Sequence, residues 1–297
     1  MCVPKSGLCT TRRSRDAINN PLSYEHSEHW NKMANSNFRS EVFENRVHVW
    51  VLPLSLSQSY YGDRDSNSSA CTLITVQIAH DFLSQNISIP SPNSLKPQDL
   101  PLGVLGVLIN GIVDGNETHE KAMAVQPRGF FDFMKKKEKQ SEDRRKGFFT
   151  VPDAIQVQRL KMHEIDYRSY SGDFISNLVT VMSMAVTSPY LSKLDRLPIV
   201  VSACKRAMCF IYDRPTNSII LLDTHMHFKR RAVSVLCVAS FEEITDFIVS
   251  VTEIVFPKIF ESADAAGKFE ITCLMLTSLM SKVYKNDIFL PIKSVCE

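Results

Sequence analysis

The chain has 297 residues, of which 44% are hydrophobic, so it is long enough to bury a substantial core as one large domain or two small ones. Its 34 basic and 32 acidic residues give a formal net charge of +2, which provides no electrostatic basis for nucleic acid or an anionic membrane as the main partner. Because no run approaches about 18 consecutive apolar residues and the first thirty residues lack the apolar centre of a signal peptide, we expect a soluble protein of the cytoplasm or nucleus.

The first predicted elements follow a polar segment. Residues 1–40 lack periodic apolar positions, so we expect a flexible leader. The β-branched and aromatic run at 47–54 predicts a short strand. After a loop rich in Ser, Asn and Asp, apolar residues recur every three or four positions, which predicts a buried helix. Ser68 and Ser69 are the predicted N-caps, and they place Cys71 in the first helical turn.

The middle of the chain is predicted to be helical. The run 100–116 has the pattern of a second helix, which Gly115 would end. Thr150 is the predicted cap of a third helix, and the apolar stretch within 171–194 predicts a fourth. Between them, the charged run at 135–147 has no apolar face. We interpret it as a solvated loop or helix face rather than a binding site for an acidic partner.

The pattern changes from residue 197 onward. Four short β-rich runs separated by turn-forming residues predict an antiparallel meander. Ser240 and Glu243 then form a capping box at the start of another helix. Helices first and an antiparallel sheet second indicate an α+β fold, which we assign to a single domain at 41–297.

The third β-rich run ends in Asp223-Thr-His225-Met-His227, which resembles the metal-binding signature of the amidohydrolase superfamily. That family uses a barrel of about 250 residues, whereas only 70 residues (297 minus 227) follow His227, and none of them is a histidine. A zinc site that combines the histidines with Cys204 and Cys209 is disfavoured, because both cysteines lie in apolar runs across a predicted hairpin. We therefore expect no metal and no cofactor.

A second chemistry uses Cys71 as a nucleophile. A thiol in a first helical turn is close to the positive end of the helix dipole and to unpaired amides, which lower the thiol pKa. His225 would be the general base and later the acid, and Asp223 would hold its imidazole in one tautomer. His227 either extends the same strand face or is a solvent-facing turn residue, and the following "HFKRR" favours the turn.

This order resembles the papain-like cysteine peptidases, in which a cysteine begins the central helix and a histidine lies on a strand of the following antiparallel sheet. The Asp-x-His unit makes the ubiquitin-directed branch, typified by the herpesvirus tegument deubiquitinases, the closer likeness, over roughly residues 46–260. The resemblance implies a papain-like α+β fold with an N-terminal helical part packed on a C-terminal antiparallel sheet. Thr224 stands where that branch often has proline.

The same resemblance implies an oxyanion donor upstream of the cysteine. In that branch a glutamine about a dozen residues before the cysteine donates to the oxyanion. Gln58 lies 13 residues before Cys71 (71 minus 58), at the end of the predicted strand, and is the matching position. Asn67 is a weaker candidate.

The leading hypothesis is a cysteine-dependent hydrolase that acts on peptide or isopeptide bonds, with ubiquitin or ubiquitin-like conjugates as the substrates that the resemblance implies. Cys71, His225, Asp223 and Gln58 would be its catalytic residues. The alternative is a non-catalytic scaffold or interaction protein with the same or another α+β fold, since Cys71 could simply be the first buried residue of a helix. Under both hypotheses the expected partner is a protein.

Overall fold

The computed structural model describes residues 38–43, 46–62, 64, 66–96, 98–124, 147–227, 234–262 and 267–284. These residues all belong to one unit, Phe38–Glu297. The predicted leader at 1–40 lies outside the described residues except for its last three positions. The predicted charged loop at 135–147 also lies outside them, except for Gly147.

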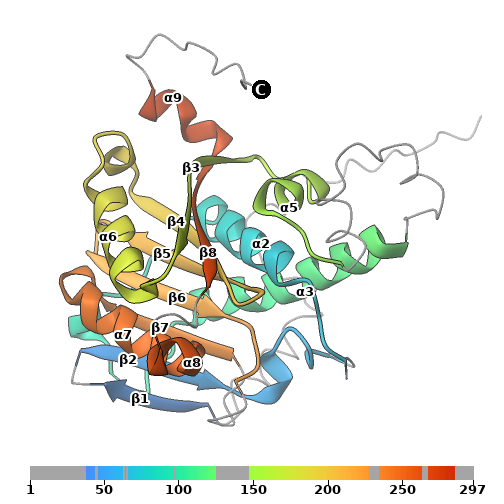
Figure 1. Cartoon of the computed structure of the whole chain (residues 1–297), viewed down its shortest axis with the longest axis horizontal. Coiled ribbons are helices and arrows are strands. Elements are labelled where there is room, and N and C mark those ends of the chain that lie inside the picture. Colours follow the sequence, from blue (N-terminus) through green and yellow to red (C-terminus); the bar gives the residue numbers. More distant parts are fainter. Residues whose placement is uncertain are drawn as a thin grey trace, which may run out of the picture. The chain divides into compact units, whose positions relative to one another are not determined.

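An antiparallel sheet forms the centre of this unit (Figure 1). In the described part of the chain it has eight strands in the order β1-β2-β7-β6-β5-β4-β8-β3, and every neighbouring pair is antiparallel. The strands are β1 (Arg39–Phe43), β2 (Val47–Leu52), β3 (Met162–Ser171), β4 (Arg196–Ala203), β5 (Arg206–Asp213), β6 (Ser218–Asp223), β7 (Ser234–Ser240) and β8 (Lys268–Leu276).

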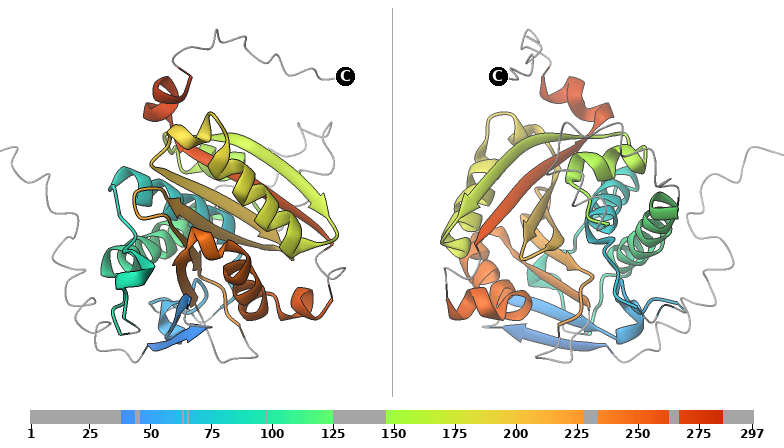
Figure 2. Two further views of the ribbon diagram at one scale, coloured as in Figure 1. Left: turned by 90° about the vertical axis from the view of Figure 1, so that its left-hand side faces the viewer. Right: turned by 45° about the vertical axis from the view of Figure 1, so that its right-hand side comes forward.

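Helices cover both faces of the sheet, as the turned views in Figure 2 make clear. The α-helices are α2 (Cys71–Ser84), α3 (Leu102–Ala124), α5 (Val151–Val157), α6 (Phe174–Thr187), α7 (Ile244–Val255), α8 (Pro257–Glu261) and α9 (Met280–Val283). Single 3₁₀ turns are η1 (Leu54–Leu56), η2 (Pro92–Ser94), η4 (Leu191–Lys193), η6 (Phe241–Glu243) and η8 (Thr277–Leu279). Helices α2, α3 and α5 lie on one face, and α6, α7 and α8 pack on the other. None of the described helices is long and apolar enough to cross a membrane.

The central strands are buried on both faces, and β5 shows how. Met208 and Phe210 pack into the core beneath α6 and α7, where the Phe210 ring meets Phe247 at 6.3 Å. Side chains alternate along a strand, so Cys209 and Ile211 point toward the opposite face, where α2 packs against β5. The continuous apolar runs in the sequence reflect this two-sided burial.

Helix α2 is enclosed between the sheet and α3, and the close packing of the two helices depends on glycine. A Cβ atom on Gly115 would lie 2.7 Å from the Cα atom of Ile74. The prediction that Gly115 ends its helix is wrong, because α3 continues nine residues further, to Ala124 (124 minus 115). The missing side chain lets α3 approach α2 and is not a stop signal.

The α+β class is confirmed, but the predicted order of helices followed by a sheet holds only in part. The four-strand meander corresponds to β4 to β7. Three strands were not predicted: β1 precedes the first predicted strand, β3 lies between α5 and α6, and β8 follows α8. The sheet is therefore assembled from the whole described length of the chain and not from its C-terminal part alone.

Candidate active site

Three segments that are distant in sequence meet at one end of β6. They are the loop after η1 that contains Gln58, the start of α2 at Cys71, and the residues that follow Asp223. The backbone N–H of Gln58 donates to the carbonyl of Thr224 (3.1 Å), and the Thr224 hydroxyl donates to Gln58 Oε1 (2.9 Å). Gln58 Nε2 donates to the carbonyl of Ser68 (3.0 Å), three residues before the cysteine. One buried glutamine thus ties the other two segments together.

Asp223 and His225 form a buried pair at the end of β6. Asp223 is 0% exposed, and its Oδ1 lies 2.6 Å from His225 Nδ1 and 3.1 Å from the His225 backbone nitrogen. Burial raises the pKa of Asp223, but the imidazoles of His225 and His227 outweigh it and hold that pKa well below its usual range. An ionised carboxylate only accepts hydrogen bonds, so Nδ1 of His225 carries a proton. Nε2 is left to exchange a proton with a nucleophile.

Cys71 interacts electrostatically with the imidazole of His225. The residue is buried, and burial raises its thiol pKa, but His225 and the Ala207 backbone outweigh burial, so the pKa is lowered. Burial lowers the pKa of His225, but Asp223 and Cys71 raise it overall. His225 Nε2 has no aligned hydrogen-bond partner among the described residues. Cys71 and His225 each favour the charged form of the other, so the two groups are electrostatically coupled.

The other buried cysteines behave in the opposite way. Burial raises the thiol pKa of Cys209, Cys237 and Cys273, and no imidazole offsets it. Cys204 is exposed in the turn between β4 and β5, so it and Cys209 do not form a metal-binding knuckle. Across the described part of the chain, no group of three or more His, Cys, Asp or Glu side chains is arranged to hold a metal ion.

The start of α2 has no side-chain cap, which corrects the prediction for Ser68 and Ser69. Ala70 is the N-cap residue, and no described side chain accepts from the first turn. The Ser68 hydroxyl instead accepts from the Ala70 backbone N–H (3.1 Å) and donates to Asn116 Oδ1 (2.6 Å). The first four amides of a helix have no partner within the helix. The Cys71 amide is therefore not consumed by a capping oxygen.

His227 is part of this cluster, and its interpretation as a solvent-facing turn residue is wrong. The side chain is buried, and its Nε2 lies 2.5 Å from Asp223 Oδ2. Its Nδ1 lies 3.2 Å from a guanidinium nitrogen of Arg206. The chain after β6 bends so that His225 and His227 each contact one oxygen of the same carboxylate. The spacing of two residues between His225 and His227 therefore lets both imidazoles hydrogen-bond to Asp223.

The two candidate oxyanion donors are placed differently. Gln58 is buried and lies in the loop six residues after β2 (58 minus 52), not at the end of the strand as predicted. Its Oε1 accepts from the Thr224 hydroxyl, and one Nε2 hydrogen is donated to the Ser68 carbonyl. The second Nε2 hydrogen remains for another acceptor. Asn67 is exposed.

Asn116 supports the site from α3 and was missed in the sequence. It is 5% exposed, its Nδ2 donates to the Gln58 carbonyl (2.9 Å), and its Oδ1 accepts from Ser68. In the sequence it belongs to a glycosylation sequon, but its burial in the folded chain removes that interpretation. A polar residue one position after Gly115, where α3 approaches α2, is the signal that could have identified it.

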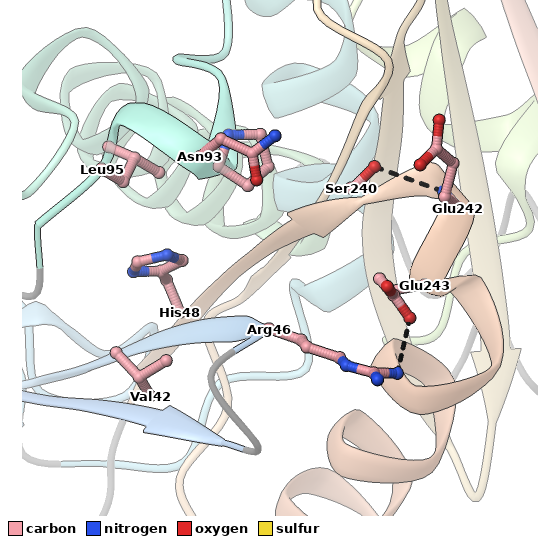
Figure 3. A pocket seen from close by; sticks show the side chains of 9 residues that line it. Val42, Arg46, His48, Asn93, Leu95, Ser240, Glu242 and Glu243 are labelled. Carbon is pink, nitrogen blue, oxygen red and sulfur yellow. Dashed lines mark hydrogen bonds and ion pairs between the residues drawn. The ribbon is translucent and has the colours of Figure 1, made fainter.

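A pocket of about 540 Å³ lies at the edge formed by β1, β2, η2 and η6 (Figure 3). Its lining residues are Val42, Arg46, His48, Pro92, Asn93, Leu95, Ser240, Glu242 and Glu243. Arg46 donates to Glu243 (2.9 Å) and Asp246 (2.7 Å), so its charge is already balanced. None of the Cys71, His225, Asp223 or Gln58 side chains lines this pocket.

Neither a scan of protein-family models nor a search of the curated proteins finds a match to this chain. Among solved structures, the chain is similar to the ubiquitin-specific protease of the murine cytomegalovirus tegument protein M48, in complex with a ubiquitin-based suicide substrate. That likeness has a TM-score of 0.42 and 11% identity, over 75% of this chain and 84% of the other. The Pseudomonas avirulence protein AvrPphB matches with a TM-score of 0.35 and 7% identity, over 70% of this chain and 92% of the other. Because both scores lie below 0.5, neither neighbour determines the function of this chain.

Proposed function

We propose that this protein is a cysteine-dependent hydrolase that cleaves peptide or isopeptide bonds, with Cys71 as the nucleophile. The observation that carries the proposal is the buried Asp223–His225 pair, 2.6 Å apart, whose imidazole lowers the pKa of the Cys71 thiol. A thiolate beside a protonated imidazole is the form in which cysteine is a strong nucleophile near neutral pH.

In the first step the Cys71 thiolate attacks the carbonyl carbon of the scissile bond, and the carbonyl π electrons move to oxygen. The oxyanion then collapses, the C–N bond breaks, and the imidazolium of His225 gives its Nε2 proton to the leaving amine. The product is a thioester on Cys71. Asp223 keeps the ring oriented and stabilises its protonated form.

In the second step water attacks the thioester carbonyl carbon, and neutral His225 takes a proton from the attacking water. The carbon–sulfur bond breaks, the acid product leaves, and the thiolate–imidazolium pair is restored. In both steps we assign oxyanion binding to the Cys71 backbone N–H and to the second Nε2 hydrogen of Gln58. The uncapped start of α2 supports the first assignment, and the Ser68 bond that fixes the Gln58 amide supports the second.

We further propose ubiquitin or ubiquitin-like conjugates as the substrates. The support is the order of residues in the chain: a glutamine, then a cysteine at a helix start, then Asp-x-His at the end of a strand. Such substrates end in an extended C-terminal tail, so a ubiquitin moiety should add binding energy that a short peptide lacks.

Labelling with a ubiquitin probe that carries a C-terminal propargyl group tests the proposal. The Cys71 thiolate would add to the alkyne and form a vinyl thioether, seen as a shift of one ubiquitin mass on a denaturing gel. We expect labelling of the wild type, loss of labelling in Cys71→Ala, and wild-type labelling in Cys209→Ala, which removes a buried thiol of the sheet. Circular dichroism and a thermal melt establish that each variant is folded.

The non-catalytic alternative has one observation in its favour: the side chain of Gln58 already bonds Ser68 and Thr224 and could be purely structural. A folded wild type that neither ubiquitin nor ubiquitin-like probes label would contradict the proposed substrates. If Cys71 also failed to react faster than a free thiol with iodoacetamide at pH 6, the hydrolase proposal itself would fail.

A further inference from the structure

The second oxygen of Asp223 is held as firmly as the first. His227 Nε2 lies 2.5 Å from Oδ2, and the Asp223 side chain is 0% exposed, so water does not reach this carboxylate. A buried carboxylate oxygen without a donor is costly, because the ionised group loses its hydration without replacement. The proposed mechanism requires only the contact between Oδ1 and His225 and does not use His227.

The proton positions around His227 follow from its other neighbour. Arg206 NH1 lies 3.2 Å from His227 Nδ1, and a guanidinium group only donates hydrogen bonds. His227 Nδ1 therefore carries the lone pair, and its proton lies on Nε2, directed at Asp223. The result is a chain of donors that runs from Arg206 through His227 to Asp223. It ends on the carboxylate that accepts from His225.

Besides His227, the Arg206 guanidinium contacts the C-terminal end of a helix. NH1 also donates to the carbonyl of Val255 (3.3 Å), the last residue of α7. The last four carbonyls of a helix have no partner within it, and a cation at this end also interacts favourably with the helix dipole. Arg206 is the first residue of β5, so the network joins the sheet, the end of α7 and the Asp223 carboxylate.

We propose that His227 and Arg206 are positioning residues that hold the Asp223 carboxylate in the plane His225 requires, and so keep the His225 ring in the orientation in which it acts on Cys71. This inference rests on the proposed function for its kinetic consequence, but its effect on the thiol is independent of any substrate. The described titratable or charged groups around the pair are Cys71 on α2, Arg206 on β5 and Cys237 on β7, besides Asp223 and the two histidines.

The test replaces the donor at position 227 in two ways. His227→Leu removes the bond to Oδ2, so the carboxylate can turn away from His225, whereas His227→Gln keeps an N–H donor at a similar distance. We expect His227→Leu to raise the pH midpoint of Cys71 alkylation by iodoacetamide by about half to one unit. We also expect kcat on a fluorogenic ubiquitin substrate to fall about 10- to 100-fold with KM changed less than about 2-fold. His227→Gln should restore most of both.

His48→Leu is the matched control, because His48 is also buried and its Nδ1 has no described partner. It should leave the alkylation midpoint and kcat unchanged. Arg206→Met should reproduce part of the His227→Leu effect by freeing Nδ1, and it serves as the second variant if His227→Leu does not fold.

Two outcomes would overturn the inference. One is a folded His227→Leu, or a folded Arg206→Met, with the wild-type midpoint for Cys71. The other is an equal effect of Leu and Gln at position 227. A wild type with an activated Cys71 but no turnover of ubiquitin substrates would contradict the proposed substrates only. The role of His227 would then be decided by the Cys71 alkylation midpoints of the wild type, His227→Leu and His227→Gln.

Discussion

Two buried aspartates lie at opposite ends of the β5–β6 strand pair, and their partners differ. At the turn end, Asp213 accepts from Arg196 Nε (2.8 Å) and from the Thr216 hydroxyl (2.7 Å). At the open end, Asp223 accepts from two imidazoles, at 2.6 and 2.5 Å. Both carboxylates are 0% exposed.

The difference between the two ends lies in what the partners can do with their protons. A guanidinium stays protonated at any pH a protein survives, so the Asp213 cluster is fixed. The imidazole of His225 can give up and take back a proton at Nε2, so the charge beside Asp223 can change during a reaction. The same residue type on adjacent strands thus contributes to stability at one end and, in our proposal, to catalysis at the other.

The largest expected difference comes from replacing each aspartate with asparagine. Asp223→Asn should lower kcat roughly 100- to 10,000-fold, because an amide N–H facing Nδ1 fixes the wrong tautomer of His225. Asp213→Asn should leave kcat within about 3-fold but lower the free energy of unfolding by about 3 kcal/mol, since Arg196 loses its buried counter-charge. Turnover of the fluorogenic ubiquitin substrate and urea unfolding measure the two effects. Equal loss of kcat in both folded variants would show that the two ends do not differ in function.

The second prediction concerns pH and the thiols. The pKa of Cys71 is lowered, so its thiolate persists as the pH falls, whereas Cys209 on β5 has a raised pKa and stays protonated. From pH 8 to pH 6 an unperturbed thiol with a pKa of about 8.5 should lose roughly 80-fold in alkylation rate, while the loss for Cys71 should be clearly smaller.

Mass spectrometry of the iodoacetamide-labelled peptides measures each cysteine separately. In Asp223→Asn the fall in the Cys71 alkylation rate from pH 8 to pH 6 should approach that of the unperturbed thiol. In Asp213→Asn this fall should stay as in the wild type. A wild-type Cys71 that reacts as slowly as Cys209 throughout this range is the result that would contradict the lowered pKa.

The smallest expected effects come from two threonines, Thr216 beside Asp213 and Thr224 next to Asp223, one at each end of the strand pair. Thr216→Val removes the hydroxyl donor to Asp213, and Thr224→Val removes the donor to Gln58 Oε1, in each case with little change of shape. Each should cost about 1 kcal/mol of unfolding free energy. Only Thr224→Val should also lower kcat, by about 5-fold, because the Gln58 amide loses one of its two fixed contacts. A fall in kcat in Thr216→Val, or none in Thr224→Val, would argue against a functional Gln58.

Local signals in the sequence located several parts of this arrangement. The apolar periodicity after residue 70 predicted the helix α2, which begins at Cys71, and the four β-rich runs correspond to β4 to β7. Thr150 caps α5 by accepting from the Asp153 amide (3.3 Å), as its position before an early proline indicated. These features depend on residues within a few positions of one another, which is the range over which pattern and propensity act.

Other features depend on partners far along the chain. β3 was missed because its residues alternate between exposed and partly buried at the sheet edge, so no apolar run marks it. Gly115 was misinterpreted because the reason for glycine is the backbone of Ile74, on another helix. Ser68 was expected to cap a helix, yet its hydroxyl bonds Asn116 on α3.

The sequence by itself determined the α+β class, the helix that begins at Cys71, and the strand that ends in Asp223 with His225 two residues on. Only the tertiary structure decided that Gln58, Cys71 and His225 share one location, and that His227 turns back to the same carboxylate. The physical reason is that a buried charge must find its donors wherever the fold provides them. Here the donors to Asp223 are His225 and His227, on a loop whose bend no local pattern indicates, and Arg206 on a neighbouring strand contacts the far side of the His227 ring.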